Sequence, residues 1–213
     1  MTSQTAKLPR QFYRMPLRPC PYLPGRTEQN IFTELAGPSN GSLYNMLTQA
    51  GFRRSHSIAY RPACPGCQAC VAVRVLAAEF APGRSLRRVA GANADLLVST
   101  VPAKANTEHY RLFSRYVAAR HYDGEMADMT YADFAAMVEE SPLPSELTEF
   151  RTRDGRLLAA CLSDELRDGI SAVYSYFDPD EVRRSLGSYV VLRLVEVTRA
   201  LGLPYLYLGY WIG

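Results

Sequence analysis

The stretch ISAVYSYFDPDEVRRSLGSYVVLRLVEVTRALGLPYLYLGYWI, residues 170–212, predicts a complete unit of strand, turn, helix and strand. Its first residues alternate, with Tyr174 and Tyr176 on one face and Val173 and Phe177 on the other. This period of two is typical of a half-buried β-strand. We therefore expect the rest of the chain to be arranged around this unit.

A helix and a second strand follow in the same stretch. Apolar residues recur at helical spacing from Leu186 to Leu201, and Gly202 followed by Pro204 is a helix stop. A strand is then predicted over residues 205–212. A strand, helix and strand joined by short turns form a right-handed parallel crossover, so the helix begins at the carboxyl end of the first strand. Ligands are expected at that end.

The turn before this helix contains Arg184, Ser185 and Gly187. Free backbone N–H groups, the positive end of the helix dipole and a guanidinium are predicted to meet there, which suits a phosphate. The alternative is a simple helix cap, in which Ser185 caps the helix and Arg184 is solvated.

Length and charge place the chain among ordinary proteins without membrane spans. The sequence has 213 residues and a net charge of +3. It has no apolar run of about 18 residues and no apolar core of a signal peptide, so we expect a cytoplasmic protein that makes no membrane contact. Residues 1–88 hold twelve Lys and Arg against three acids, which gives this part +9 and the remainder −6. This distribution of charge indicates that the N-terminal part binds a polyanion. The alternative is that these charges are only solvated surface residues.

Cysteines are concentrated in the N-terminal part. Cys64, Cys67 and Cys70 form a C-x2-C-x2-C array, and Cys20 is a possible fourth ligand. Thiols with this spacing suit zinc or an iron–sulfur cluster, and the alternative is reduced structural or redox-sensing thiols. Cys161 lies in an apolar strand and is predicted to be a core residue.

The remaining elements predict the fold class. Beyond an extended N-terminal segment, the expected elements are a helix over 42–51, strands over 71–76 and 95–101, helices over 107–121 and from 130 to about 142, and strands over 146–152 and 157–163. We expect an α+β protein with two parts. Residues 1–92 form a basic cysteine-containing region, and residues 93–213 have the strand and helix order of the N-acetyltransferase (acyl-CoA N-acyltransferase) fold.

Eight short motifs carry a resemblance to a known family. They are CPYLPG (20–25), GFRRS (51–55), YRP (60–62), RHYDG (120–124), SAVY (171–174), DP (178–179), RSLG (184–187) and YLYLGYWI (205–212). Together they are similar to the aminoacyl-tRNA protein transferases, and most closely to the short bacterial leucyltransferase type. The resemblance runs from about Cys20 to the end. Family members continue past the last strand with a Lys-rich tail, whereas this sequence ends at Gly213.

The resemblance implies transfer of an amino acid, with leucine favoured over arginine, from charged tRNA to the N-terminal Asp or Glu of a target protein, which marks the target for degradation. The amine attacks an activated ester, so the enzyme must position the reactants, remove a proton and stabilise an oxyanion. No cofactor is required for this step. Iron–sulfur clusters of eukaryotic members make a metal at the four cysteines an expectation here.

Roles for individual residues are expected on this basis. Asp178 is the first candidate for the catalytic base, His121 the second, and Tyr174 is included in the catalytic set. The alternatives are purely structural roles, namely an Asp-Pro turn for Asp178 and a helix-end cap for His121. Arg184, Ser185 and Gly187 are expected to bind the terminal phosphates of the tRNA. Its adenosine would stack on Tyr174, Tyr207 or Trp211, although core packing is the favoured alternative for Trp211. Arg53, Arg54 and Arg61 are predicted to bind the acidic side chain of the target, or else the tRNA backbone.

Two other functions remain open from the sequence. One is a metal-bearing RNA-binding module without transferase activity, in which the cysteines and the basic N-terminal part suffice. The other is an N-acyltransferase that uses acetyl-CoA. The bulk of Tyr189 argues against the acetyl-CoA hypothesis, because Tyr189 occupies a position where that cofactor needs a small residue.

Overall fold

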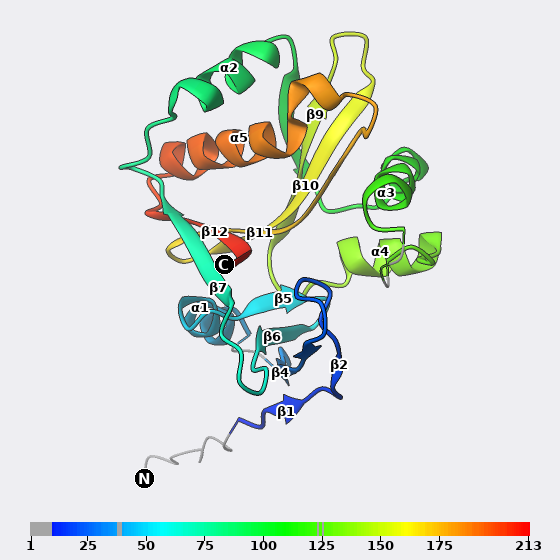
Figure 1. The fold of residues 1–213 in the computed structure, drawn as a ribbon. Helices are drawn as coiled ribbons and strands as arrows, with labels where there is room; N and C mark the ends of the chain where they lie inside the picture. The colour runs from blue at the N-terminus through cyan, green and yellow to red at the C-terminus, as the bar shows by residue number, and fades with distance from the viewer. Residues whose placement is uncertain (1–9, 38–39, 123, 125) are drawn as a thin grey trace.

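A six-stranded mixed sheet forms the centre of the protein (Figure 1). The computed structural model describes residues 10–37, 40–122, 124 and 126–213. The strand order is β7-β12-β11-β10-β9-β8, and only β11 and β12 are parallel. The strands are β7 (Cys70–Leu76), β8 (Leu97–Pro102), β9 (Ser145–Arg151), β10 (Leu157–Leu166), β11 (Gly169–Phe177) and β12 (Tyr205–Ile212). The protein is therefore α+β, as the sequence predicts.

Helices cover both faces of this sheet. They are α2 (Arg84–Ala92), α3 (Thr107–Arg120), α4 (Tyr131–Glu139) and α5 (Leu186–Ala200). Helix α1 (Asn40–Gln49) lies beside the N-terminal strands and packs in a third core. In Figure 1, α5 and α2 lie on one side of the sheet, and α3 and α4 lie on the other. Each side has its own apolar core, because β8, β9, β10 and β11 contribute side chains to the core under α5 and to the core under α3 and α4. Burial of these two cores provides the main driving force for folding.

The predicted order of strand, two helices, three antiparallel strands, helix and strand is confirmed from β8 to β12. Local signals explain its accuracy. Asn106 caps α3 by accepting a hydrogen bond from the His109 amide. Thr130 and Asp133 form the predicted capping box at the start of α4. The motif residue Asp123 lies outside the described residues.

The parallel pair β11 and β12 separates part-way along its length. Backbone pairing ends at Ser171 and Tyr207. Beyond this point β11 stays paired with β10 as far as Phe177, whereas β12 stays paired with β7 as far as Ile212. The two strands therefore diverge, and this fork has open backbone on both of its inner edges.

A β-bulge lies at the same place. The register between β10 and β11 shifts between Leu162 and Ser163, which leaves Val173 as the extra residue. The prediction that Val173 shares a face with Phe177 is therefore wrong. Val173 packs with Tyr174 against the core under α3, and Phe177 packs on the α5 side.

The N-terminal part contains more regular structure than the sequence predicts. A four-stranded sheet has the order β1-β4-β6-β5, and a small ribbon pairs β2 with β3. These strands are β1 (Tyr13–Arg14), β2 (Arg18–Pro19), β3 (Thr27–Glu28), β4 (Asn30–Glu34), β5 (Arg53–Ser55) and β6 (Ile58–Pro62). They are short and polar, so they lack the alternation that would reveal them. Helix α1 covers Asn40–Gln49, so it begins and ends two residues before the predicted bounds of 42–51.

Strand β7 joins the N-terminal part to the central sheet. It pairs antiparallel with β12, from Cys70 opposite Ile212 to Leu76 opposite Tyr205. The boundary predicted at residue 92 remains a prediction, but a strand from the first part is an edge of the central sheet. No helix in the described part of the chain is long and apolar enough to cross a membrane.

Candidate active site

A cavity of about 260 Å³ lies where β11 ends and α5 begins. Its lining includes Arg120, Phe177, Asp178, Ser185, Gly187 and Ser188. Ser185 has the left-handed φ of 50°, which costs a residue with a Cβ about 1–2 kcal/mol. A Cβ added at Gly187 would stand 3.1 Å from the Phe177 ring, so glycine permits this close packing. Ser185 and Gly187 therefore lie where the sequence predicts a phosphate site.

Arg184 does not line this cavity. Its guanidinium donates two hydrogen bonds to Asp95, at 2.8 and 2.9 Å, and one to the carbonyl of Ala92. The bonds to Asp95 raise the pKa of Arg184 and tie the turn to the end of α2. Arg120 supplies a cation to the cavity instead. Its guanidinium lies 5.6 Å from the Phe177 ring and makes no hydrogen bond or ion pair with the described residues.

Asp178 is buried at the end of β11, with 3% of its surface exposed. Its Oδ1 accepts hydrogen bonds from Arg115 at 2.8 Å and from the amide of Asp180 at 3.1 Å. Arg156 lies 3.8 Å from its Oδ2. The Asp178 carboxylate is engaged by two guanidinium groups and by the backbone of the turn, so this arrangement suits a positioning role for Asp178 better than proton transfer.

His121 and Tyr174 approach the same end of β11 from the α3 side. His121 follows the last turn of α3 and is exposed, and its ring centroid lies 5.6 Å from that of Tyr116. Tyr116 is in turn 4.8 Å from Phe177, which lines the cavity. Tyr174 is half-buried, 5.9 Å from Phe113, and burial raises the pKa of its hydroxyl.

Of the candidate stacking residues on β12, Tyr207 is buried and Trp211 is exposed. The Tyr207 ring packs in a third core with α1, and its hydroxyl donates to Asp168 at 2.9 Å. Burial is the main reason that the pKa of Tyr207 is raised to about 12. Trp211 is 62% exposed on the diverging part of β12, so the expectation of core packing is wrong for it. Only Trp211 of these two presents its ring to a ligand.

Tyr189 turns its ring away from the start of α5. The ring lies 5.6 Å from that of Phe150 and belongs to the core under α5. Its bulk therefore does not fill the turn, and it gives no argument against coenzyme A.

Two of the three arginines predicted to bind the target are internal. Arg53 donates to the carbonyls of Leu208, Phe52 and Val73, and burial lowers its pKa. Leu208 comes directly after the last residue of β12 that pairs with β11, so Arg53 satisfies backbone at the base of the fork. Arg54 forms a buried bidentate pair with Asp164, at 2.6 and 2.8 Å.

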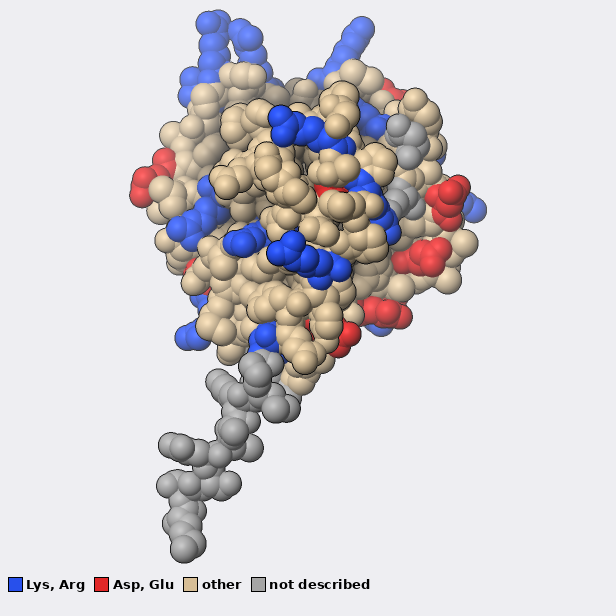
Figure 2. Space-filling view, turned by 60° about the horizontal axis from the view of Figure 1, so that its bottom comes forward, with Lys and Arg blue, Asp and Glu red and all other residues tan. Residues whose placement is uncertain are grey.

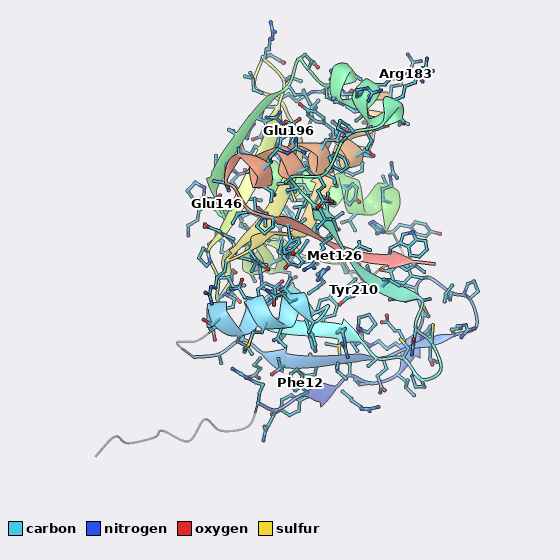
Figure 3. All side chains as sticks on the ribbon, turned by 90° about the vertical axis from the view of Figure 1, so that its left-hand side faces the viewer. Phe12, Met126, Glu146, Arg183, Glu196 and Tyr210 are labelled. Atoms are coloured by element: carbon cyan, nitrogen blue, oxygen red, sulfur yellow. The ribbon has the colours of Figure 1, made fainter. Side chains whose placement is uncertain are left out.

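Arg61 is the exposed member of this set. It lies over the Phe52 ring at 5.2 Å and donates to the carbonyl of Ala50 at 3.2 Å. It lines a groove of about 570 Å³ between the cysteine turn, the end of α1 and Tyr210. Tyr210 can be followed in Figure 3, where it lies between the N-terminal sheet and the rest of the molecule. Figure 2 shows basic side chains spread over the middle of the face that the N-terminal part presents.

The four cysteines of the predicted metal site lie together. Cys20, Cys64, Cys67 and Cys70 all line one cavity of about 210 Å³. Backbone amides donate to sulfur at two of them, from Leu23 to Cys20 and from Gln29 to Cys64, each at 3.4 Å. Burial, followed by the three neighbouring thiols, raises the pKa of Cys70. Cys161 is buried in the core as predicted, and its pKa is raised to about 12.

These cysteines fit a soft metal in the number and type of their donor atoms, and the N–H···S bonds would stabilise thiolates. The four cysteines line one cavity, but their side chains are not arranged as a coordination shell. The described residues contain no group of three or more His, Cys, Asp or Glu side chains arranged to hold a metal ion.

The sequence matches two family models that together cover most of the chain. Residues 18–88 match the N terminus of the arginine-tRNA-protein transferases, and residues 108–213 match the C terminus of the same family. The chain belongs to this family. It is therefore an aminoacyltransferase that uses aminoacyl-tRNA as its substrate.

Curated members of the arginine-tRNA-protein transferase family resemble the chain over nearly its whole length. Proteins named aspartate/glutamate leucyltransferase are 53% identical in Paramagnetospirillum magneticum, over 97% of this chain and 85% of that protein, and 53% identical in Parvibaculum lavamentivorans, over 100% and 88%. The one from Granulibacter bethesdensis is 52% identical over 96% and 76%.

One solved structure shares the fold. The structure of L-PGS from Bacillus licheniformis matches with a TM-score of 0.53 and 10% identity, over 84% of this chain and 52% of that one. At this identity the match concerns the fold alone. It agrees with the α+β architecture.

Sequence reasoning missed Arg120, which lines the cavity at the start of α5, and Arg115, which contacts Asp178. Arg120 belongs to one of the quoted motifs, but only the packing of α3 against β11 shows that its side chain reaches the cavity at the start of α5. Arg115 stands five residues earlier and carried no motif signal.

Proposed function

We propose that this transferase moves leucine from leucyl-tRNA to the N-terminal Asp or Glu of target proteins and so marks them for degradation. Identity of about 50% to proteins named aspartate/glutamate leucyltransferase, over nearly the whole chain, supports leucine as the donor residue and acidic N-termini as acceptors. Because aminoacyl-tRNA is made in the cytoplasm, we place the reaction there.

The fork between β11 and β12 is the proposed position of the aminoacyl ester. This arrangement is the one expected of an N-acetyltransferase-like fold, with the N-terminal cysteine region packed against it. Pairing ends at Ser171 and Tyr207, and α5 begins at the far end of β11. The terminal phosphates of the tRNA then lie in the cavity of Ser185, Gly187 and Arg120, and the adenosine stacks on Trp211.

His121 is the proposed proton acceptor. The target's amine must lose a proton as it attacks the ester carbonyl, the new amide bond forms, and the ribose hydroxyl leaves. An exposed imidazole is available for this step, whereas the Asp178 carboxylate is held by Arg115. Asp178 then positions the turn between β11 and α5, and Tyr174 lines the fork from the α3 side. His121→Asn is expected to lower kcat about a hundredfold without changing Tm, and Asp178→Asn is expected to lower stability instead.

Recognition of the acidic residue falls to Arg61, beside its groove, since Arg53 and Arg54 are bonded internally. Arg61→Gln is expected to raise the KM for a peptide that begins with Asp and to leave the KM for tRNA unchanged.

The deciding experiment supplies the protein with tRNA charged with labelled leucine and a peptide that begins with Asp. Label is expected on the peptide. Parallel reactions contain arginyl-tRNA or acetyl-CoA. Transfer of arginine alone, or of acetyl alone, would contradict the proposal. RNA retention with no transfer would favour a binding module.

Trp211→Ala is expected to raise the KM for tRNA about tenfold, and Trp211→Phe is expected to keep the KM close to that of the wild-type protein.

A second proposal concerns Cys20, Cys64, Cys67 and Cys70, which we infer hold zinc or an iron–sulfur cluster that stabilises the N-terminal part. A bound metal would crosslink the turn after β2 with the cysteine turn before β7. Protein purified without oxygen is expected to contain about one zinc, or iron with sulfide, per chain. Cys67→Ser is expected to lower both the metal content and Tm. Wild-type protein free of zinc, iron and sulfide would contradict this.

A further inference from the structure

Helix α2 presents three arginines on one face. Arg84, Arg87 and Arg88 are spaced i, i+3 and i+4, so they are neighbours on the helix surface, and all three are exposed. Leu86 and Val89 point the other way, and Val89 packs against the core around α5. The apolar side of α2 is therefore used for packing, and its basic side faces solvent.

The charge on this face is not neutralised by the described residues. Arg84 and Arg88 make no hydrogen bond or ion pair there, and Arg87 donates only to the carbonyl of Pro82, at 2.8 Å. Arg183, exposed in the 3₁₀ turn Val182–Arg184, is likewise unpaired in the described structure. Figure 3 shows Arg183 beside α2 at the top of the molecule.

Three acids around this face already have partners, whereas Glu79, five residues before Arg84 in the chain, is exposed. Asp95 accepts two hydrogen bonds from Arg184. Glu181 is bonded to Arg184 and Arg156. Glu196 on α5 is paired with Arg193. The surface formed by Arg84, Arg87, Arg88 and Arg183, called here the α2 basic face, is therefore strongly positive.

This face is attached directly to the cavity at the start of α5. The side chain of Asn93, the cap of α2, donates to the Arg184 carbonyl at 2.8 Å, and Arg184 donates to the Ala92 carbonyl at 3.1 Å. Ser185, which lines the cavity, is the next residue. With a rise of about 1.5 Å per residue, Arg84 and Arg88 lie on the order of 10 Å along the helix from this junction. A nucleic acid whose end occupies the cavity passes within reach of them.

We propose that the α2 basic face binds the phosphate backbone of the RNA duplex that continues from the aminoacylated 3′ end. This inference rests on the proposed function, because the cavity must hold that end. The chemistry favours a duplex backbone. The face consists of arginines, which pair with phosphates in a bidentate manner, and it has no exposed aromatic ring to stack on bases. Contacts of this kind position a nucleic acid without reading its sequence.

The test compares Arg84→Gln/Arg88→Gln with the wild-type protein on two donors, leucyl-tRNA and 3′-O-leucyl-adenosine, which lacks the duplex. The preference for leucyl-tRNA, as a ratio of kcat/KM values, is expected to fall about five- to tenfold. The slope of log KM for leucyl-tRNA against log salt is expected to decrease by about 2, one for each phosphate contact removed.

Arg111→Gln/Arg167→Gln is the matched control. It removes the same charge from exposed positions on α3 and on the turn between β10 and β11, and is expected to leave the preference and the slope unchanged. An unchanged slope in the α2 variant, an equal effect of the control, or a raised KM for the peptide alone would overturn the inference.

Failure of the proposed function has a different result. If the wild-type protein transfers leucine from neither donor, the transfer proposal fails. Binding of uncharged tRNA, followed by fluorescence anisotropy over a range of salt, still tests the α2 basic face. Loss of affinity and of salt slope in the α2 variant then supports the inference, and equal binding contradicts it.

Discussion

Strand β5 and helix α2 each contain a pair of adjacent arginines, and the structure uses the two pairs in opposite ways. Arg53 and Arg54 on β5 are 5% and 4% exposed, and their donors are taken by carbonyls and by Asp164. Arg87 and Arg88 on α2 are exposed, and only one hydrogen bond from their guanidinium groups is present in the described structure. The comparison teaches that an arginine pair indicates a binding surface only where no internal acceptor reaches it.

The difference arises from the packing around each pair. Strand β5 lies at the junction of the two sheets, where Leu208 and Val73 expose carbonyls and β10 places Asp164. Buried acceptors of this kind need donors, because an unpaired polar group in the interior costs about 1–3 kcal/mol. Helix α2 lies on the outside of α5 and meets no such acceptors.

The largest expected effect is on stability and concerns the buried pair on β5. Arg54→Ala should lower the free energy of unfolding by about 3–5 kcal/mol, because it leaves the Asp164 carboxylate buried with only Ser145 as a remaining side-chain partner. Denaturant unfolding measures this change. Arg88→Ala is the control, with an expected change below about 0.5 kcal/mol. Similar losses in the two variants would show that burial does not distinguish them.

A second prediction sharpens the comparison at the start of α5, where Arg120 lines the cavity and Arg184 is bonded to Asp95. Arg120→Gln should lower kcat/KM for leucyl-tRNA about tenfold, which is about 1.4 kcal/mol, because the proposed interaction with the phosphate is lost. Tm should change little, since within the described residues Arg120 makes no hydrogen bond or ion pair and its contact with the Phe177 ring is at an exposed site. Arg184→Gln should lower Tm. Steady-state kinetics and thermal unfolding of both variants provide the check. A drop in Tm for Arg120→Gln with unchanged kinetics would reverse the assignment.

The smallest expected effect concerns the partly exposed ion pair of Arg184 and Asp95. Hydrogen bonds from Arg184 hold the pKa of Asp95 below its usual value of about 3.9. The stabilisation is therefore fully present above the usual value and is lost as pH falls through the lowered one. Since the Asp95 side chain is 49% exposed, it should be below about 1 kcal/mol. Asp95→Asn should lower Tm slightly at pH 6, and its effect should become smaller as pH falls below the usual value. An effect that grows on acidification would contradict this.

Elements with strong local signals were predicted well. The alternation of β11, the helical period of α5 and the capping box of Thr130 and Asp133 depend on neighbouring residues, so they were visible in the sequence. The short strands β4, β5 and β6 were missed, because their register depends on partners elsewhere in the chain. The face of Val173 was predicted wrongly because a bulge depends on the pairing of β10.

The site shows the same division. The motif containing Ser185 and Gly187 indicated the helix start, and a cavity lies there. The sequence analysis favoured core packing for Trp211, whereas in the structure Trp211 is exposed and Tyr207 is buried. The register shift in β12 leaves the first exposed and the second packed with α1, and only the path of β12 beside β7 decides this.

The sequence by itself determined the order of the elements from β8 to β12, the family and the place where the helix of the crossover begins, because periodicity, caps and motifs are local properties. Tertiary structure alone decided which arginines are bonded inside and which face solvent, and where β11 and β12 part. Those outcomes depend on acceptors and strand partners far away in the chain, such as Asp164 for Arg54 and β7 for β12, and no local pattern specifies such distant contacts.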